Sequence, residues 1–443
     1  MSRRHSPDHR GGGEQQRKDE QELRQDPVHA GAAYASTPEQ AMTSDKGTRR
    51  TSGAVEGLLT SRLYRGRAKE LPLVTPRTVH LIAAARPNFM KVAPLWHALN
   101  AAADFRPVLI HTGQHYDANM SDAIFADLRL SAPDHHLGVG SGSHAEQTGR
   151  VMIAYEQVAM AERPDWLVVV GDVNSTLACA LVGAKLGIPT VHLEAGLRSR
   201  DRSMPEEINR VATDAICDVL WTPSPDGDEN LLAEGVPAER ITRVGNIMLD
   251  SFEMARPAIE AAAVPAELGL ATAYGVVTLH RPANVDDPTT LARLVRCLLD
   301  IQRELPLVFP VHPRTAVRLE QQGLDHVLAN AGVRLVPPQS YIRFMSLVAG
   351  ATAVVTDSGG IQEETTYLSI PCLTLRENTE RPITVTQGTN QLASPADVLG
   401  KLQRSLARRA EVTRRPELWD GRTAERCVAD LRRRGSQALV AAA

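Results

Sequence analysis

The sequence is poor in aromatic side chains, which make up 4% of its 443 residues, so its cores must be built mainly from Leu, Val, Ile and Ala. It also lacks any uninterrupted apolar run of the ~18 residues that a membrane helix needs. No apolar segment follows the charged start, so no secretory signal is predicted. The formal net charge is only −3, which favours neither nucleic acid nor an anionic membrane as a partner. We therefore expect a cytoplasmic protein whose cations for any anionic ligand are gathered locally.

Signatures of disulfides, metals and dinucleotides are missing as well. The cysteines form no C-x-x-C pair and lie far apart, which predicts reduced thiols. The histidines show no H-E-x-x-H or comparable spacing, so no metal is expected. The segment GVGSGSHA at 138–145 fits G-x-G-x-x-A, but no buried strand precedes it. We expect no cofactor. The five cysteines are Cys179, Cys217, Cys297, Cys372 and Cys427.

The organisation of the chain changes near residue 75. The first 75 residues are rich in charge, Gln and Gly and have little to bury, so a disordered tail is predicted. From Thr78 onward, short β-branched runs alternate with helical periodicity, which is typical of βαβ units. This alternation occurs twice, in a chain too long for one ordinary core. We predict an α/β fold with two Rossmann-like, doubly wound parallel-sheet domains at 76–246 and 247–415, a cleft between them, and a C-terminal helix and tail at 416–443.

The predicted elements follow from these periodicities. In a helix predicted at 204–220, apolar residues recur at i, i+3 and i+4 and form one stripe: Ile208, Val211, Ala212, Ala215, Ile216, Val219 and Leu220. Other helices are predicted at 87–102, 176–186 and 416–435. Strands are predicted at 79–84, 108–112, 166–170, 190–193 and 220–222, and then at 274–279, 307–311, 333–335, 353–356 and 372–375.

Ligands of open α/β sheets bind beyond the carboxyl ends of the strands, so polar residues that follow predicted strands are the candidate site. In the first half, Asp172 in GDVNST fits either a ligand site or the N-cap of the next helix. Glu194 in HLEAGLRS is harder to explain structurally. Glu206 fits a capping box with Ser203 as well as a functional role. Further residues of this kind are Arg86, Lys91, Gln114, His115, Arg198 and Glu207.

The second half offers groups suited to phosphate and sugar. In TDSGGIQEE at 356–364, a strand ends, two glycines allow close approach of a ligand, and a helix begins whose free N–H groups suit a phosphate. Glu364 lies one turn into that helix, where its carboxylate can accept hydrogen bonds from ribose hydroxyls. The alternative is a capped helix start, with Asp357 or Ser358 as the N-cap.

Three cationic residues belong to the same half. His280 ends a predicted strand and is a candidate phosphate contact. Arg376 and Arg381 follow a buried strand, where a charge-assisted bond to phosphate is one interpretation. A surface ion pair with Glu377 or Glu380 is the other.

Ten short blocks occur in order along the chain: ARPNFMKVAPL, HTGQHYD, GDVNSTLACAL, HLEAGLRS, MPEEINR, GNIMLD, TLHRPANVD, PVHPR, TDSGGIQEE and LRENTERPIT. With these blocks, residues 79–430 resemble the non-hydrolysing UDP-N-acetylglucosamine 2-epimerase family. Any single block is weakly specific, but ten at compatible spacing are very specific.

This resemblance implies a GT-B-like architecture in which the second domain holds UDP and the sugar faces the first. It implies that Asp172, Glu194 and Glu206 are catalytic, together with His280, which contacts the phosphates. It implies no cofactor and no metal, a UDP-aminosugar as the small-molecule partner, and a homodimer. The residues that it implies for substrate binding are Arg86, Lys91, Gln339, Phe344, Ser358, Gly359, Gly360, Glu364 and Arg381.

The implied reaction is elimination of UDP to a 2-acetamidoglucal, followed by re-addition with a proton on the opposite face of carbon 2. Two departures from the family pattern leave the substrate open. The chain reads Ala84-Ala85 where members often have Gly-Thr, and L-H-R-P-A-N-V-D rather than G-H-R-R-E. UDP-N-acetylglucosamine and a related UDP-diacetamido sugar are therefore alternatives. A GT-B glycosyltransferase and a non-catalytic nucleotide-sugar sensor are rivals from other classes.

Overall fold

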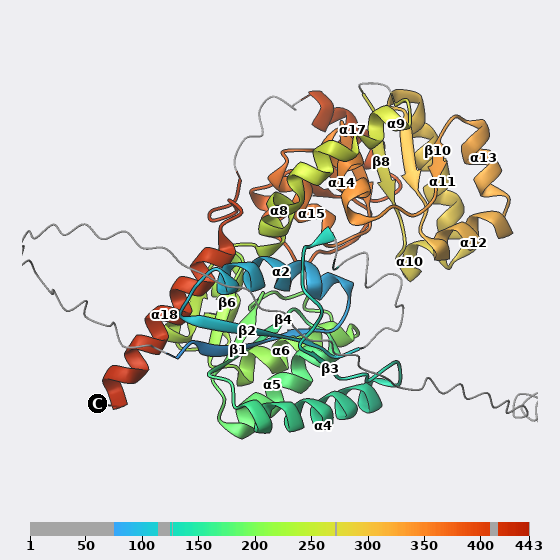
Figure 1. Cartoon of the computed structure of the whole chain (residues 1–443). Helices are drawn as coiled ribbons and strands as arrows, with labels where there is room; N and C mark the ends of the chain where they lie inside the picture. The colour runs from blue at the N-terminus through green and yellow to red at the C-terminus, as the bar shows by residue number, and fades with distance from the viewer. Residues whose placement is uncertain (1–74, 114–124, 126, 271–272, 408–414, 443) are drawn as a thin grey trace, which may run out of the picture. The chain divides into compact units, whose positions relative to one another are not determined.

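The computed structural model describes residues 75–113, 125, 127–270, 273–407 and 415–442 (Figure 1). The tail predicted to be disordered lies outside the described residues, as do Gln114 and His115. The five cysteines are free thiols, as predicted. None of the described helices is long and apolar enough to cross a membrane.

Within the described residues, seven strands form the first sheet, in the order β3-β2-β1-β4-β5-β6-β7, and every pair is parallel. The central strands are short β-branched and leucine-rich runs buried on both faces, as expected when helices cover both sides of a sheet. The strands are β1 (Arg77–Ala83), β2 (Phe105–His111), β3 (His135–His136), β4 (Trp166–Val170), β5 (Thr190–Leu193), β6 (Val219–Thr222) and β7 (Ile241–Arg243).

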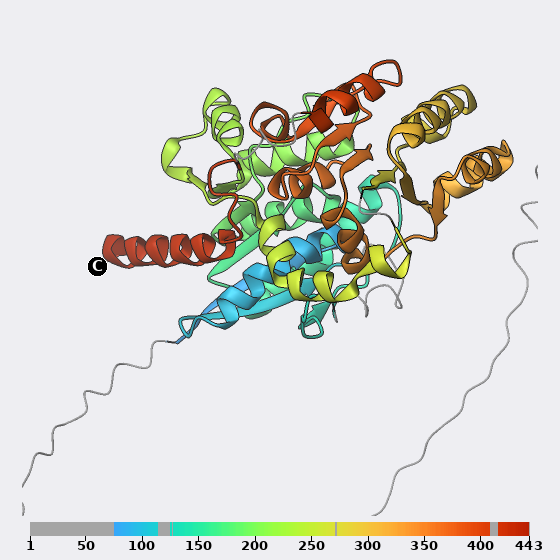
Figure 2. The same cartoon turned by 90° about the horizontal axis from the view of Figure 1, so that it is seen from above.

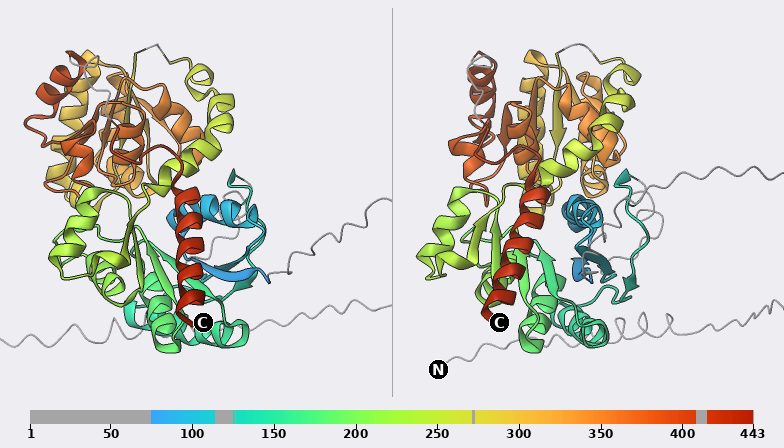
Figure 3. Two further views of the ribbon diagram at one scale, coloured as in Figure 1. Left: turned by 90° about the vertical axis from the view of Figure 1, so that its left-hand side faces the viewer. Right: turned by 60° about the vertical axis from the view of Figure 1, so that its left-hand side comes forward.

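Helices cover both faces of this sheet. One face packs against α2 (Arg86–Asn100) and the C-terminal helix α18 (Thr423–Ala442), and the other packs against α4 (His144–Glu162) and α5 (Asn174–Leu186). Figure 3 shows α18, in red, running beside the first sheet. Trp221 Nε1 of β6 donates a hydrogen bond to Asp430 Oδ2 of α18 at 2.8 Å. The end of the chain therefore belongs to the core of the first sheet. Two further helices are α6 (Pro205–Ile216) and α7 (Pro225–Ala233).

The second sheet has six described strands in the order β10-β9-β8-β11-β12-β13, again all parallel. Two apolar clusters lie on its two faces. Its strands are β8 (Gly275–Thr278), β9 (Leu307–Pro310), β10 (Arg334–Val336), β11 (Ala353–Thr356), β12 (Cys372–Thr374) and β13 (Asn390–Leu392). Its helices are α9 (Val264–Glu267), α10 (Pro282–Val285), α11 (Pro288–Glu304), α12 (Pro313–Gln321), α13 (Leu324–Asn330), α14 (Tyr341–Ala349), α15 (Ile361–Tyr367), α16 (Ile383–Thr386) and α17 (Val398–Ala407). The prediction of two parallel-sheet α/β domains is thus confirmed.

Helix α8 (Ile247–Ala262) contacts α2 of the first sheet as well as α14 and α15 of the second (Figures 1 and 2). The Ser251 hydroxyl donates to the carbonyl of Met90, and the Tyr367 hydroxyl donates to Glu253 Oε1 at 2.5 Å. One helix therefore packs against helices that belong to both sheets. The division of the chain at residue 247 stays a prediction.

The predicted end of the 204–220 helix is wrong. Helix α6 ends at Ile216, and Val219–Leu220 already belong to β6. Its buried face is polar, with Arg210 and Asp214 among its members, whereas Ile208 is 49% exposed. The apolar stripe therefore faces away from the core, because a buried polar network occupies the inner face.

Candidate active site

The first sheet presents a buried ion pair beyond its carboxyl edge. Glu194 directly follows β5. Its Oε2 accepts a hydrogen bond from the ammonium of Lys91, a residue of α2. The two side chains are 5% and 11% exposed. The Lys91 ammonium also lies 3.2 Å from the position that a Cβ would occupy at Gly171, which follows β4. Lys91 thus stands next to the turn that carries Asp172.

The backbone of Glu194 is strained. Its φ is 74°, in the left-handed region that non-glycine residues rarely adopt. Such a conformation costs roughly 1–3 kcal/mol and persists only where the surroundings enforce it. Here the amides of Glu194 and Ala195 both donate to the carbonyl of Trp221, at 3.1 and 3.0 Å. This strained backbone directs the Glu194 carboxylate toward Lys91. Strained residues of this kind cluster at functional sites, so we interpret Glu194 as a functional residue.

A buried polar network fixes this turn from behind. Asp214 of α6 accepts hydrogen bonds from His192 Nδ1 at 2.6 Å and from the amide of Gly196 at 3.1 Å, and it pairs with Arg198 Nη1 at 2.7 Å. Burial alone would raise the pKa of Asp214, but His192 and Arg198 outweigh burial and lower it. The other ring nitrogen of His192 lies 2.8 Å from the carbonyl of Gly171. One network therefore positions both the Glu194 turn and the Asp172 turn.

Asp172 is one-third exposed and pairs with Arg210 of α6. Burial would raise its pKa, but Arg210, Lys91 and Arg381 together lower it. The N-cap alternative is wrong, because α5 begins after Val173 and has no side-chain cap. Arg381 comes after β12 of the second sheet, so its effect on the pKa of Asp172 indicates that groups of the two sheets lie near each other.

Glu206 is not brought into this group. It lies exposed in the first turn of α6, whose N-cap is Met204 without a side-chain cap. The capping-box alternative is wrong too, because Ser203 donates to Asp201. Its neighbour Glu207 is buried, accepts hydrogen bonds from Ser199 and Arg200, and pairs with Arg210.

In the second sheet, Asp357 organises the loop that carries His280. The carboxylate is fully buried and accepts from the amides of His280 and Arg281, both at 3.0 Å. His280 Nδ1 lies 3.0 Å from the same carboxylate, so Nε2 is the nitrogen left for a ligand. The expected N-cap role of Asp357 or Ser358 is wrong, because α15 starts from Gly360. Ser358, Gly359 and Gly360 form the turn between β11 and α15.

A buried cluster follows β12. Arg381 Nε lies 2.8 Å from Glu363 Oε1 of α15, and Arg381 Nη1 donates to Glu380 Oε1 at 3.0 Å. Arg376 Nη2 donates to the other oxygen of Glu380 at 2.8 Å. The pairing with Glu380 was one of the expected alternatives, but these side chains are at most 12% exposed, so the pair is not a surface pair.

The groups of the two sheets meet at Glu363. Burial raises the pKa of Glu363, Glu194 raises it further, and Arg381 and Lys91 oppose the rise. Glu194 Oε1 and Glu363 Oε2 are both buried without a hydrogen-bond partner among the described residues. Buried carboxylate oxygens are normally satisfied, so these two oxygens suit the hydroxyl or amide donors of a ligand. Sequence reasoning missed Glu363, although the two adjacent acids in TDSGGIQEE offered a signal.

The outer part of the second site involves α14. Glu364 accepts from the Tyr341 hydroxyl at 2.9 Å, and burial raises its pKa to about 7. Phe344 packs against the apolar cluster on this face of the sheet. Gln339 lies in the loop before α14, and its Oε1 accepts from Arg343 Nε at 2.9 Å.

Two further expectations concern Arg86 and metals. Arg86 begins α2 at the carboxyl end of β1, but its side chain lies outside what the structure describes. Across the described ranges, no group of three His, Cys, Asp or Glu side chains is arranged to hold a metal ion.

Comparison with known proteins gives a consistent family. A profile described as UDP-N-acetylglucosamine 2-epimerase matches residues 97–432. The chain is 40% identical over 337 residues to the UDP-N-acetylglucosamine 2-epimerase of Methanococcus maripaludis, covering 74% of this chain and 91% of that protein. It is 39% identical over 320 residues to the UDP-2,3-diacetamido-2,3-dideoxy-D-glucuronate 2-epimerase of Pseudomonas aeruginosa, covering 71% and 88%.

Solved structures agree. The UDP-GlcNAc 2-epimerase of Methanocaldococcus jannaschii, in complex with UDP-GlcNAc and UDP, superposes with a TM-score of 0.70 at 39% identity. The match covers 80% of this chain and 99% of that one. The putative epimerase of Listeria monocytogenes gives a TM-score of 0.72 at 28% identity, covering 82% and 97%.

The network behind the Glu194 turn yields a stability prediction. Asp214→Asn removes the buried carboxylate that His192, Arg198 and the amide of Gly196 share, so we expect a loss of about 3–5 kcal/mol in the free energy of unfolding. Glu234→Gln is the matched control, because Glu234 pairs with the same Arg198 but is 38% exposed, and should cost about 0–1 kcal/mol. Urea unfolding followed by circular dichroism measures both. Equal losses of unfolding free energy in the two variants would contradict the prediction that the buried Asp214 stabilises the fold more than the partly exposed Glu234.

Proposed function

This chain belongs to the UDP-N-acetylglucosamine 2-epimerase family, and we propose that it inverts carbon 2 of a UDP-linked N-acetylhexosamine. The substrate proposed first is UDP-N-acetylglucosamine, with UDP-N-acetylmannosamine as the product. The observation that carries the proposal is the meeting of Glu194 and Lys91 from one sheet with Arg381 and Glu363 from the other. Acid–base groups and diphosphate-binding groups thus share one buried space.

The chemistry explains why both kinds of group are needed. The hydrogen on carbon 2 is not adjacent to a carbonyl, so its removal alone would leave an unstabilised carbanion. When the bond between carbon 1 and the UDP oxygen breaks, UDP leaves with that electron pair. Loss of the carbon-2 proton to a carboxylate then supplies the pair for the double bond of a 2-acetamidoglucal. Re-addition of UDP, with a proton delivered to the opposite face of carbon 2, gives the epimer.

The proposed proton transfers fall to carboxylates near the sugar. Glu194 pairs with Lys91 at the carboxyl edge of the first sheet, and we assign it the role of base. Asp172 stays ionised beside Arg210 and fits a role in tuning or transferring the second proton. Burial raises the pKa of Glu363, which makes it a candidate to exchange a proton with the intermediate.

Glu206 remains a catalytic candidate through the family pattern alone. Because it is exposed here, its participation requires the start of α6 to move toward the sugar. Closure of the domains around a bound substrate would supply that motion.

The second sheet is proposed to hold UDP. His280 Nε2 and the turn of Ser358, Gly359 and Gly360 would contact the diphosphate, and Arg381 would offset its charge. Gln339 and Phe344 are assigned to the uracil, and Glu364 to the ribose. From the first sheet, Arg86 and Lys91 would reach the phosphate and sugar.

A UDP-diacetamido sugar is the second candidate substrate. The similarity to the Pseudomonas aeruginosa UDP-2,3-diacetamido-2,3-dideoxy-D-glucuronate 2-epimerase nearly equals that to the UDP-N-acetylglucosamine epimerases. A GT-B glycosyltransferase is disfavoured, because it would need an acceptor and would not exchange the carbon-2 proton.

The test is incubation with each UDP-aminosugar in deuterated water. We expect deuterium at carbon 2 of the re-isolated sugar nucleotide and formation of the 2-epimer. No incorporation with either class of substrate would overturn the proposal, and incorporation with the diacetamido sugar only would settle the substrate against UDP-N-acetylglucosamine.

The carboxylates give a second prediction. Asp172→Asn, Glu194→Gln and Glu363→Gln should each bind UDP within about threefold of wild type while losing roughly 10²–10⁴-fold in turnover, the usual contribution of an acid–base group. Isothermal titration with UDP and the deuterium assay measure the two effects. Full turnover in any of these variants removes that residue from the catalytic set.

The pKa of Glu364 gives a third. If ribose hydroxyls donate to this carboxylate, UDP binds the ionised form better and lowers the pKa from about 7. UDP affinity should therefore rise with pH and level off above about pH 7, with a gain of roughly tenfold between pH 6 and 8. Titration of Glu364→Gln over the same range corrects for the ionisation of UDP and of every group other than Glu364. An identical pH profile in wild type and variant would remove Glu364 from the ribose site.

The homodimer is a separate proposal. Helix α4 packs on α5, and α5 packs on α6. Ile153 and Met160 of α4 are 66% and 60% exposed, and Ile208 and Val211 of α6 are 49% and 38% exposed. Exposed apolar side chains grouped on neighbouring helices mark protein interfaces. A second copy of the chain, joined by a twofold axis, would cover the same surface on both subunits.

We expect Ile208→Glu and Ile153→Glu to convert the dimer to monomers, because each places two like charges in an apolar interface. Val317→Glu is the control, since Val317 is 50% exposed on α12 of the other sheet. Sedimentation velocity distinguishes the species. Persistence of the dimer in both interface variants, or a monomeric wild type, would contradict this interface.

A further inference from the structure

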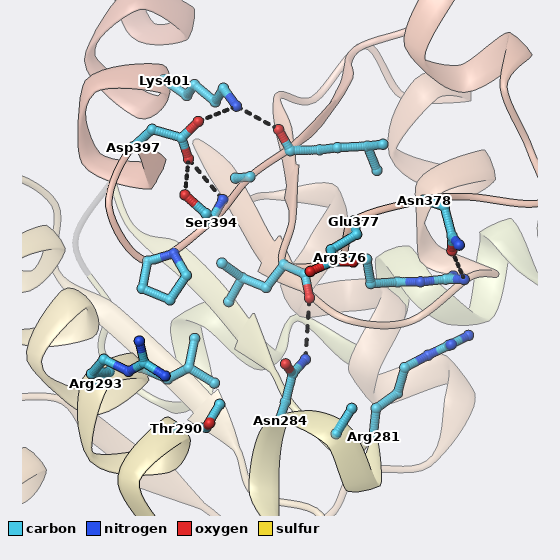
Figure 4. Close-up of a pocket in the computed structure, with 16 residues that line it drawn as sticks. Arg281, Asn284, Thr290, Arg293, Arg376, Glu377, Asn378, Ser394, Asp397 and Lys401 are labelled. Carbon is cyan, nitrogen blue, oxygen red and sulfur yellow. Dashed lines mark hydrogen bonds and ion pairs between the residues drawn. The ribbon is translucent and has the colours of Figure 1, made fainter.

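A cavity of about 680 Å³ lies beside the second sheet, and its lining includes no residue of α14 and neither of the proposed uracil contacts (Figure 4). Its walls come from α10, α11, α17 and the segments that follow β12 and β13. We propose that this cavity binds a phosphate-bearing small molecule at a second site, distinct from the one that holds UDP. The volume falls within the range of ordinary small-molecule sites.

The charge of the lining favours an anion. The lining holds four cationic side chains, Arg281, Arg293, Arg376 and Lys401, against two carboxylates, Glu377 and Asp397. Glu380, just outside the lining, pairs with Arg376 and lies 4.0 Å from Arg281. Asp397 is already paired with Lys401 and with Ser394. The chain as a whole carries a net charge of −3, so this excess of cations is local.

Two of these cations have hydrogen-bond donors without a partner among the described residues. Arg376 is 6% exposed, and its Nη1 has no hydrogen-bond partner among the described residues. Arg293 makes no hydrogen bond or ion pair with any residue that the structure describes. Leaving a buried guanidinium nitrogen unpaired costs free energy, so an acceptor from a ligand fits this position.

The rest of the lining suits the body of such a molecule. Thr290, Asn284 and Asn378 offer hydroxyl and carboxamide groups for the oxygens of a sugar or nucleoside, while Leu294 and Leu392 provide an apolar surface. In Figure 4, Arg293 and Arg376 stand on different sides of the cavity, with Lys401 above them. Separated cations fit a diphosphate better than a single carboxylate.

Glu380 links the cavity to the active site. One of its oxygens accepts from Arg376, which lines the cavity, and the other accepts from Arg381, which interacts with Glu363 and Glu194. An anion bound to Arg376 competes with Glu380 and adds negative charge near the UDP phosphates. Occupancy of the cavity should therefore weaken UDP binding, and UDP should weaken occupancy by the same factor.

The test is isothermal titration of the full chain with pyrophosphate, alone and in the presence of saturating UDP. With the active site filled, pyrophosphate should still bind with a stoichiometry of one, and less tightly than to a UDP-free protein. Arg293→Ala should weaken this binding at least about fivefold and Arg293→Glu should abolish it, because a charge-assisted bond is removed and then reversed. UDP affinity should stay within twofold in both variants. Arg296→Ala is the control, since it removes an exposed arginine one turn further along α11 and should change neither binding.

Three outcomes would overturn the proposal: no pyrophosphate binding to the UDP-saturated protein, wild-type binding in the Arg293 variants, or Arg293-dependent binding of D-glucuronate without binding of pyrophosphate. The result does not depend on the proposed function. If UDP itself fails to bind, the proposed function fails, and the Arg293 variants still decide the cavity site in the titration without UDP.

Discussion

The candidate site depends on a buried ion pair, Lys91 with Glu194, and on its electrostatic interaction with Arg381 and Glu363 of the other sheet. Two cations and two anions balance, so their burial in a region of low dielectric is tolerable. The balance leaves one oxygen of each carboxylate without a partner. Unpaired buried oxygens do not stabilise the fold, but they can accept hydrogen bonds from the hydroxyl groups of a bound sugar. The unsatisfied oxygens are thus the physical link between stability and function.

The functional groups of both sheets are positioned by the same kind of interaction. A buried aspartate behind the strand ends collects loop amides and a histidine: Asp214 with His192 in the first sheet, and Asp357 with His280 in the second. Because these acids are anchored inside the core, the loops that they hold carry little conformational freedom. The strained φ of Glu194 is maintained in this way. Positioning of the reactive groups therefore rests on residues that would not touch the substrate.

Much of this was predictable from the sequence, and the exceptions have physical causes. β-Branched runs located the central strands, with β4 and β5 correct to the residue, because strands buried on both faces read as continuous apolar segments. Strand β3, two histidines long, carries no such signal. The apolar stripe of α6 does not reveal its buried face, because periodicity cannot show that Arg210 and Asp214 have buried partners elsewhere in the chain. Glu363 was missed for the same reason, since its partners Arg381 and Glu194 are brought near only by the fold.

The most direct measurement of the central claim is a crystal structure of the Glu194→Gln variant with UDP-N-acetylglucosamine bound. The diphosphate should lie against Ser358–Gly360, and carbon 2 of the hexose should face the carboxamide at position 194, with sugar hydroxyl or amide groups donating to Glu363. A hexose that points away from position 194 while UDP occupies the second sheet would contradict the idea that these two sets of groups serve one substrate.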